Sequence, residues 1–240
     1  MASLYSNKDK NSGHFSLNYD SNFLFNQTDK LFLLMKTVNN NIILIGPLAT
    51  GKSTIAAKLS GISGLLNHPV DKLKWYYRFK NGYDLHTSTK ILKKQGFEEL
   101  IKYVQQYFGP DELRAILYEF AGIIDLGATD SYCTDVFHLR KLKKIFNNFP
   151  NVFLILPSPS EEISVKILND RLTRRYENDS LKAPVMNSYI EMNKKFIASE
   201  FNKQIANHTI YTEGKTIEML ANELLNKSKF INYERAAAIL

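Results

Sequence analysis

The sequence lacks the features that would hold a chain together covalently or place it in a membrane. Its 240 residues contain a single cysteine, Cys133, which excludes an internal disulfide framework. Its longest apolar runs, residues 31–35 and 152–156, are far shorter than the ~20 residues that a membrane-spanning helix needs. The N-terminus also lacks the basic and apolar regions of a signal peptide. We therefore expect a protein of the reducing cytoplasm with no membrane insertion.

Acidic residues are in the minority, with 24 Asp and Glu against 31 Lys and Arg, which gives a formal net charge of +7. The lysines are nevertheless spread along predicted helices, for example at 93–94, 143–144 and 194–195, and do not gather with aromatic residues into one patch. Solvated helix faces explain most of this charge, so nucleic acid is left open as a partner but is not favoured.

The composition predicts one main folded unit. Residues 1–28 mix Ser, Asn, Lys and Gly without a hydrophobic period, which indicates a flexible leader. The remaining length, in a chain that is 44% hydrophobic and 23% charged, is sufficient for one core with a small inserted lid. We expect a single domain over residues 29–228 and a short tail over 229–240.

The most informative feature is the loop of residues 46–53, Gly-Pro-Leu-Ala-Thr-Gly-Lys-Ser, between the apolar run 42–45 and a helical pattern over 54–59. Strand, glycine-rich loop and helix in this order are typical of a phosphate-binding P-loop. Gly46 and Gly51 allow backbone N–H groups to wrap a phosphate chain, and the helix directs its positive end at the anion. The plainer alternative is a strand-to-helix turn that holds no phosphate.

The P-loop assigns ligands to particular side chains. Lys52 supplies a cation for the β- and γ-phosphates, and Ser53 supplies a hydroxyl ligand for Mg²⁺. The predicted nucleotide-binding residues are Gly46, Thr50, Gly51, Lys52, Ser53 and Thr54. The cofactors expected from the motif are therefore ATP and Mg²⁺.

Buried strands alternate with helices along the rest of the chain. Continuous apolar runs predict strands at 42–45, 121–125, 151–156 and 208–212, and helical spacing predicts helices at 88–108, 111–120, 132–149 and 216–225. A further helix is expected from about Ser158, with Glu161 at capping-box spacing. This alternation indicates a three-layer α/β fold with a mainly parallel sheet, in which ligands bind at the carboxyl ends of the strands.

Two aspartates fall at those strand ends. Asp125 closes a hydrophobic strand as a Walker B acid does, where it can hold Mg²⁺ opposite Ser53, although a strand-end aspartate can also simply cap the next loop. Asp71 lies about a dozen residues beyond the P-loop helix, where a carboxylate can accept the proton of an attacking hydroxyl; the alternative is a surface turn after Pro69.

Three arginines follow the helix after residue 156. Arg171, Arg174 and Arg175 are spaced so that at least two share a helix face, and their guanidinium groups suit a transferring phosphoryl group. A solvated helix end is the alternative. The turn-prone residues 177–180 and 183–184 follow, so we expect a mobile helical lid over about 171–197.

The order of these motifs over about residues 41–225 resembles the shikimate kinase and nucleoside-monophosphate kinase group of P-loop phosphotransferases. The resemblance implies a five-stranded sheet, a P-loop kinase-like domain over 29–228, and a lid arginine among those at 171–175. It further implies that Asp71 contacts the phosphoryl-accepting hydroxyl, that Arg78 grips a substrate carboxylate, and that Gly127 lies in the substrate-binding turn. Shikimate itself is not expected, because residues 70–72 lack the paired acids and residues 125–127 lack the triple glycine of shikimate kinases.

The sequence thus predicts an ATP- and Mg²⁺-dependent phosphotransferase that acts on a hydroxyl of a small metabolite, in a shikimate-kinase-like manner. One alternative is a regulatory P-loop protein that binds nucleotide without transfer. Another alternative is a nucleotide or nucleic-acid kinase, which the basic charge of the chain would suit. The aromatic run at 75–79 supports it if those rings stack on a base and do not fill the core.

Overall fold

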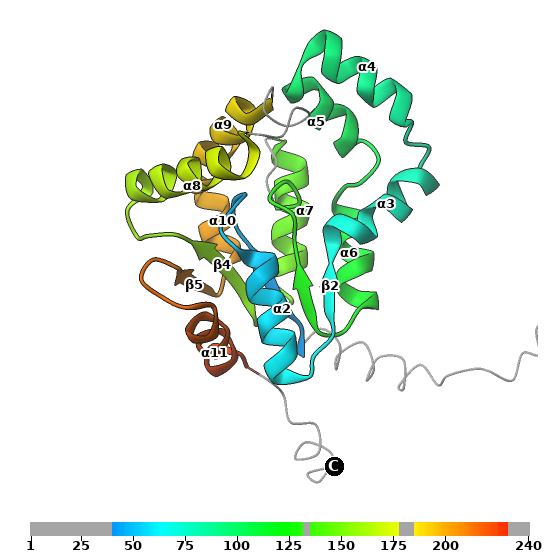
Figure 1. Cartoon of the computed structure of the whole chain (residues 1–240). Coiled ribbons are helices and arrows are strands. Elements are labelled where there is room, and N and C mark those ends of the chain that lie inside the picture. The colour runs from blue at the N-terminus through cyan, green and yellow to red at the C-terminus, as the bar shows by residue number, and fades with distance from the viewer. Residues whose placement is uncertain (1–39, 132–134, 178–184, 230–240) are drawn as a thin grey trace, which may run out of the picture.

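The computed structural model describes residues 40–131, 135–177 and 185–229 (Figure 1). The predicted leader over 1–28, most of the predicted tail (230–240) and Cys133 lie outside these residues. Residues 178–184, in the middle of the predicted lid, lie outside them as well.

Five parallel strands form the sheet, in the order β2-β3-β1-β4-β5. The strands are β1 (Ile42–Ile45), β2 (Asn67–Pro69), β3 (Ile123–Asp125), β4 (Val152–Leu156) and β5 (His208–Tyr211). β1 lies in the middle, with Ile42 in register with Ile123 on one side and Ile43 with Val152 on the other. Because all five strands run the same way, their carboxyl ends meet at one edge of the sheet.

Ten helices of the described residues surround this sheet. They are α2 (Lys52–Ser63), α3 (Val70–Lys80), α4 (Leu85–Gln95), α5 (Phe97–Gln105), α6 (Pro110–Glu119), α7 (Val136–Phe146), α8 (Glu161–Tyr176), α9 (Met186–Ile197), α10 (Glu200–Ile205) and α11 (Ile217–Lys227). Figure 1 shows α4 and α5 extending away from the sheet, at the opposite end of the molecule from α11.

Side chains of the central strand alternate between two apolar layers. Ile42 and Leu44 pack with α2 and α11, whereas Ile43 and Ile45 pack in a second cluster that draws on α6, α7, α8, α9 and α10. All four side chains are fully buried. The predicted three-layer α/β fold with a parallel five-stranded sheet is therefore confirmed.

The structure divides one predicted helix and adds one that the sequence did not predict. The expected helix over 88–108 is two helices, α4 and α5, divided at Gly96, whose φ of +90° is a left-handed conformation. Helix α3 was not predicted, because it begins directly after β2 without a turn. Its large aromatic residues Trp75, Tyr76 and Phe79 are exposed, so they do not mark a buried face of the helix. These aromatic residues do not fill the core.

The predicted start of α8 at Ser158 is also wrong. The N-cap is Ser160, whose hydroxyl accepts a hydrogen bond from the backbone N–H of Ile163. Ser158 instead exchanges two hydrogen bonds with Ser164, whose hydroxyl accepts from the Ser158 N–H at 3.0 Å and donates to its carbonyl at 2.8 Å. Both serines are buried, and the pair fixes the loop after β4.

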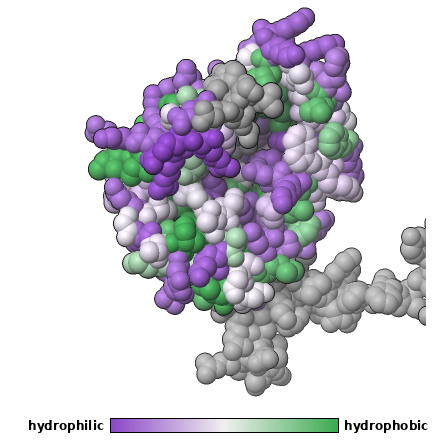
Figure 2. All heavy atoms as spheres, in the orientation of Figure 1, coloured by the Kyte–Doolittle hydropathy of each residue, from purple (hydrophilic) through white to green (hydrophobic). Residues whose placement is uncertain are grey.

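The visible surface mixes hydrophilic residues with small separate hydrophobic patches (Figure 2). Within the described ranges, no helix has both the length and the apolar content needed to cross a membrane.

Candidate active site

The P-loop forms a tight cradle between β1 and α2. A Cβ at Gly46 would lie 2.5 Å from the carbonyl oxygen of Ile155 in the neighbouring strand, so only glycine fits there. Gly51 has a φ of +93° at the N-cap of α2, and Ala49 has a φ of +64°. The hydroxyl of Thr50 donates to the carbonyl of Pro47 at 3.0 Å and closes the loop. The loop thus has the tight turn, with a helix N-terminus at its end, that a phosphate-binding cradle requires.

Lys52 lies across this cradle. Its ammonium group donates to the carbonyl oxygens of Gly46 at 2.7 Å and Pro47 at 2.9 Å, and the residue is only 8% exposed. Burial lowers the pKa of Lys52 to about 8, against the opposing effect of Asp125, Asp71 and Asp130. The charge is therefore held by loop carbonyls that a phosphate chain can replace.

Asp125 and Ser53 fit a magnesium ion. Asp125 closes β3 and is 5% exposed, and its Oδ1 atom is buried without a hydrogen-bond partner. Burial raises the pKa of Asp125, while a hydrogen bond with Ser53 and the charge of Lys52 act in the opposite direction. A hydroxyl and a buried carboxylate oxygen are ligands that Mg²⁺ accepts beside nucleotide phosphates. The last predicted nucleotide contact, Thr54, is exposed in the first turn of α2.

A second charged cluster stands beside the P-loop. Asp71, in the first turn of α3, forms an ion pair with Lys74 one turn later. Lys74 is 6% exposed and also contacts a carboxylate oxygen of Asp130 at 3.1 Å. Burial opposes the charge on Lys74, yet Asp130 and Asp71 together raise its pKa. Sequence reasoning missed Lys74 and Asp130; the three-residue spacing of Asp71 and Lys74 was the available signal.

Gly127 allows this cluster to close. Its backbone N–H donates to Asp130 at 2.8 Å. A Cβ at Gly127 would lie 2.4 Å from Oδ1 of Asp71, 2.9 Å from Oδ2 of Asp130 and 3.0 Å from the ammonium of Lys74. The predicted site residues Asp71 and Gly127 are thus in one place, and a side chain at position 127 would displace the ends of the charged side chains.

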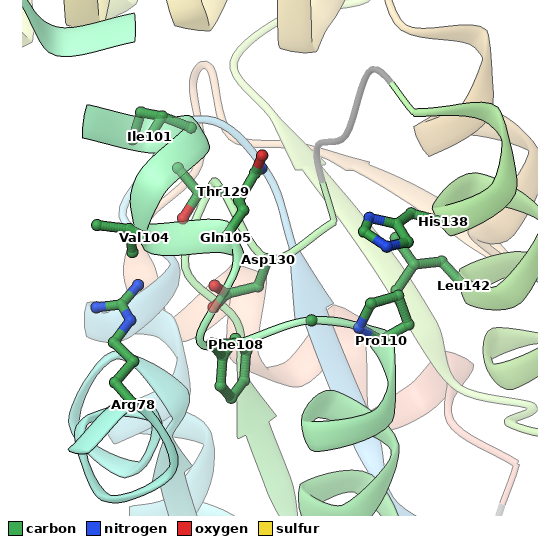
Figure 3. Close-up of a pocket in the computed structure, with 11 residues that line it drawn as sticks. Arg78, Ile101, Val104, Gln105, Phe108, Pro110, Thr129, Asp130, His138 and Leu142 are labelled. Atoms are coloured by element: carbon green, nitrogen blue, oxygen red, sulfur yellow. The ribbon is translucent and has the colours of Figure 1, made fainter. Parts of the chain in front are cut away.

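Arg78 lies on α3 one turn beyond Lys74 and lines a small cavity of about 60 Å³ with Asp130 (Figure 3). The residue is 8% exposed, and its Nε atom is buried without a hydrogen-bond partner. Burial lowers the pKa of Arg78, and its guanidinium stacks 5.1 Å from the ring centroid of Trp75. An incoming anionic group would satisfy this unpaired donor.

The three predicted lid arginines separate into two groups. Arg171 donates to the carbonyl of Ala49 in the P-loop at 3.2 Å. Arg171 and Arg174 also line a shallow hollow of about 540 Å³ between α8 and the loop of residues 212–216. Arg175 is exposed and stacks against Tyr176, with 5.3 Å between the guanidinium carbon and the ring centroid. Arg171 therefore contacts the P-loop directly, and Arg174 shares a hollow with it.

Asn193 of α9 is a third residue that sequence reasoning missed, after Lys74 and Asp130. Its side chain accepts from the Leu48 N–H at 2.8 Å and donates to the Leu48 carbonyl at 3.2 Å, and the residue is fully buried. The paired bonds tie α9 to the P-loop across 145 positions of sequence. An asparagine in a predicted helix carries no local signal of such a contact.

The chain is similar to several solved structures. The chain is similar to a shikimate kinase from Acinetobacter baumannii in complex with shikimate, with 18% identity over 79% of this chain and 93% of that one, and a TM-score of 0.50. It is also similar to a shikimate kinase from Aquifex aeolicus, with 18% identity over 82% and 98% of the two chains and a TM-score of 0.45. A tunicamycin resistance protein from Deinococcus radiodurans shows 15% identity over 80% and 97%, with a TM-score of 0.45.

No protein-family model and no curated protein matches the chain. The order of motifs predicts a resemblance to shikimate kinase. The similarity to the Acinetobacter enzyme confirms this resemblance at the level of the fold.

Proposed function

We propose that this protein is an ATP- and Mg²⁺-dependent phosphotransferase that acts on a hydroxyl group of a small metabolite. One observation carries the proposal: the buried Asp125, with an unpartnered carboxylate oxygen, and the cluster of Asp71, Lys74 and Asp130 both lie near the P-loop Lys52. Asp125 would then serve as the metal-binding acid and Asp71 as the acceptor-binding acid beside a phosphate-binding lysine, which is the arrangement that phosphoryl transfer needs.

The nucleotide side would hold the triphosphate. Lys52 would exchange the carbonyls of Gly46 and Pro47 for the β- and γ-phosphates, and Arg171 would add charge from α8. Ser53 and Asp125 would hold Mg²⁺, which neutralises charge on the phosphates when bound.

The acceptor side would position the hydroxyl. The acceptor oxygen forms a bond to the γ-phosphorus while the bond to the ADP oxygen breaks, and Asp71 takes the hydroxyl proton. Lys74 holds the Asp71 carboxylate in place through their ion pair. Arg78, with its unpaired buried Nε, would bind a carboxylate or another anionic substituent of the acceptor.

The test is consumption of ATP by the purified chain in a pool of hydroxylated metabolites, with Lys52→Ala as the control. Transfer predicts one metabolite that gains a phosphoryl group and ADP formed in equal amount, both absent with the Lys52→Ala variant. Nucleotide binding without turnover in any pool would instead identify the regulatory alternative. Steeply salt-dependent oligonucleotide binding with phosphorylation of its ends would identify a nucleic-acid kinase.

A further inference from the structure

A second cavity lies between α5 and α9, with a volume of about 400 Å³. Phe97 and Ile101 line it from α5, and Met192 and Lys195 line it from α9. A volume of this size accommodates a chemical group as large as a ring or a short chain. None of the roles assigned above to the P-loop, the Asp71 cluster or the arginines uses it.

This cavity lies next to the smaller one that contains Arg78, which we call the acceptor cavity. Ile101 and Gln105 line both of them, and in Figure 3 these two residues stand on the α5 side of the cavity that contains Arg78 and Asp130. The acceptor cavity alone, at about 60 Å³, holds only about four or five water-sized volumes. A substituent too large for the acceptor cavity would have the larger one next to it, on the other side of Ile101 and Gln105.

The larger cavity also lies beside the P-loop. Met192 precedes Asn193, the residue whose side chain bonds both backbone groups of Leu48. Phe97 and Tyr189 meet edge to face with ring centroids 5.0 Å apart, which joins α5 to α9 at this cleft. Thus α9 contacts the P-loop as well as this cleft, and α5 lines the Arg78 cavity as well as this cleft.

The lining of the cleft combines apolar surface with balanced charge. Phe97, Ile101 and Met192 supply the apolar surface, and Glu98, Lys102, Glu191 and Lys195 carry two charges of each sign. Two of these four form ion pairs with neighbours outside the lining, Lys102 with Glu99 and Glu191 with Lys194, both at 2.6 Å. Because the lining carries no net charge, the cleft favours an uncharged group over an ionic one.

We propose that the acceptor carries an apolar substituent, a ring or a short alkyl chain, which binds in the α5–α9 cleft while its hydroxylated head reaches Asp71. This inference rests on the proposed kinase function and makes it more specific. It distinguishes the acceptor from a compact polyol, which would leave the cleft empty. Burial of apolar surface would then supply affinity that the small acceptor cavity cannot.

The experiment uses the methionines of the full chain as reporters. Methyl-labelled methionine gives separate NMR signals for Met192 in the cleft and for Met219 on α11, which is 54% exposed. The probes are n-hexyl β-D-glucopyranoside and methyl β-D-glucopyranoside, which share a hydroxylated head and differ in the apolar chain. The hexyl probe should shift the Met192 signal saturably and bind on the order of tenfold more tightly than the methyl probe. The Met219 signal should not respond.

A matched pair of variants completes the test. Met192→Gln should weaken binding of the hexyl probe several-fold, Met219→Gln should leave it unchanged, and an unchanged affinity for a non-hydrolysable ATP analogue shows that both variants are folded. If Met192→Gln does not fold, Ile101→Asn on α5 provides the same test. For a true acceptor, either cleft variant should raise KM and leave kcat nearly unchanged.

Two outcomes would overturn the inference: no response of Met192 to the hexyl probe, or equal responses of Met192 and Met219. Nucleotide binding combined with a silent Met192 would overturn the cleft assignment and leave the kinase proposal standing. A response of Met192 without any nucleotide binding would support an apolar site and contradict the kinase proposal.

Discussion

The nucleotide side and the acceptor side of the site are built in different ways. On the nucleotide side, a cradle of eight consecutive residues, 46–53, carries its own glycines, lysine and hydroxyl. On the acceptor side, Asp71, Lys74 and Arg78 come from α3, while Gly127 and Asp130 come from the loop after β3. Local chain geometry thus forms the first half, and tertiary packing of two separate segments forms the second.

The two sides should therefore fail differently when mutated. A change in the cradle removes a ligand contact directly, because its groups face the phosphate chain. A change in the acceptor cluster displaces several side chains at once, because Lys74 contacts two carboxylates and Gly127 lies against both of them. The comparison can be tested by separating nucleotide affinity from acceptor KM in the same set of variants.

The largest effect is expected for Lys52→Ala. The variant should lose up to about a thousandfold in turnover and bind ATP weakly, because the transferring phosphate loses its nearest cation. Its thermal unfolding temperature should change little, since the lysine contacts only loop carbonyls. Calorimetric nucleotide binding and a melting curve measure the two effects. Full activity in the folded variant would refute the P-loop assignment.

Asp125→Asn should have the next largest effect, a loss of about a hundredfold in rate with a smaller loss in nucleotide affinity. The amide keeps the size of the side chain but removes the negative charge that Mg²⁺ would contact. The half-saturating Mg²⁺ concentration should rise when turnover is titrated with the metal. Superimposable magnesium titrations of the variant and the parent protein would show that Asp125 only closes its strand.

Gly127→Ala tests the acceptor side alone. The added methyl group would displace Asp71 and Asp130, so acceptor kcat/KM should fall between about tenfold and a hundredfold while ATP affinity is retained. Gly61→Ala in α2 is the matched control, because a Cβ there has no neighbour within 4 Å. The control should stabilise the fold by about 0.5–1 kcal/mol. Equal activity of the two variants would mean that the cluster takes no part in acceptor binding.

The same division explains what the sequence could predict. The cradle, Asp125 and the parallel sheet follow from contiguous patterns, namely a glycine-rich loop after an apolar run and strands that alternate with helices. Arg78 and Gly127 were predicted only through a family resemblance, whereas Asp71 was also predicted from its distance beyond the P-loop helix. Lys74, Asp130 and Asn193 were missed because their partners are distant in the sequence or lie on a helix that was itself not predicted.

Arg171→Ala and Arg175→Ala, compared side by side, test which arginine acts on the nucleotide side. Arg171 bonds the P-loop carbonyl of Ala49, so its loss should lower turnover about tenfold with a modest loss of ATP affinity. Arg175 stacks on Tyr176 and should be near normal. Arg174, in the same hollow as Arg171, should fall between them. Near-normal turnover in all three variants would mean that these arginines are only solvated charges at the end of α8.

The smallest effect is a pH dependence that belongs to the nucleotide side alone. Because the pKa of Lys52 is lowered from 10.5 to about 8, the folded chain loses this proton before the unfolded chain does. Lys52 by itself thus makes the fold more stable as the pH rises between these values. Its effect on ATP binding has the opposite sign, because only the charged ammonium attracts the triphosphate.

ATP affinity should therefore fall by up to about threefold between about pH 7.5 and about pH 8.5, and binding should take up a fraction of a proton. Calorimetry in buffers of different ionisation enthalpy measures that uptake. Lys52→Arg should flatten the profile, since a guanidinium stays charged throughout this range. Acceptor KM depends on Asp71 and Arg78 and should not follow the same curve. A flat affinity profile for the parent protein would show that Lys52 keeps its proton at the phosphate site.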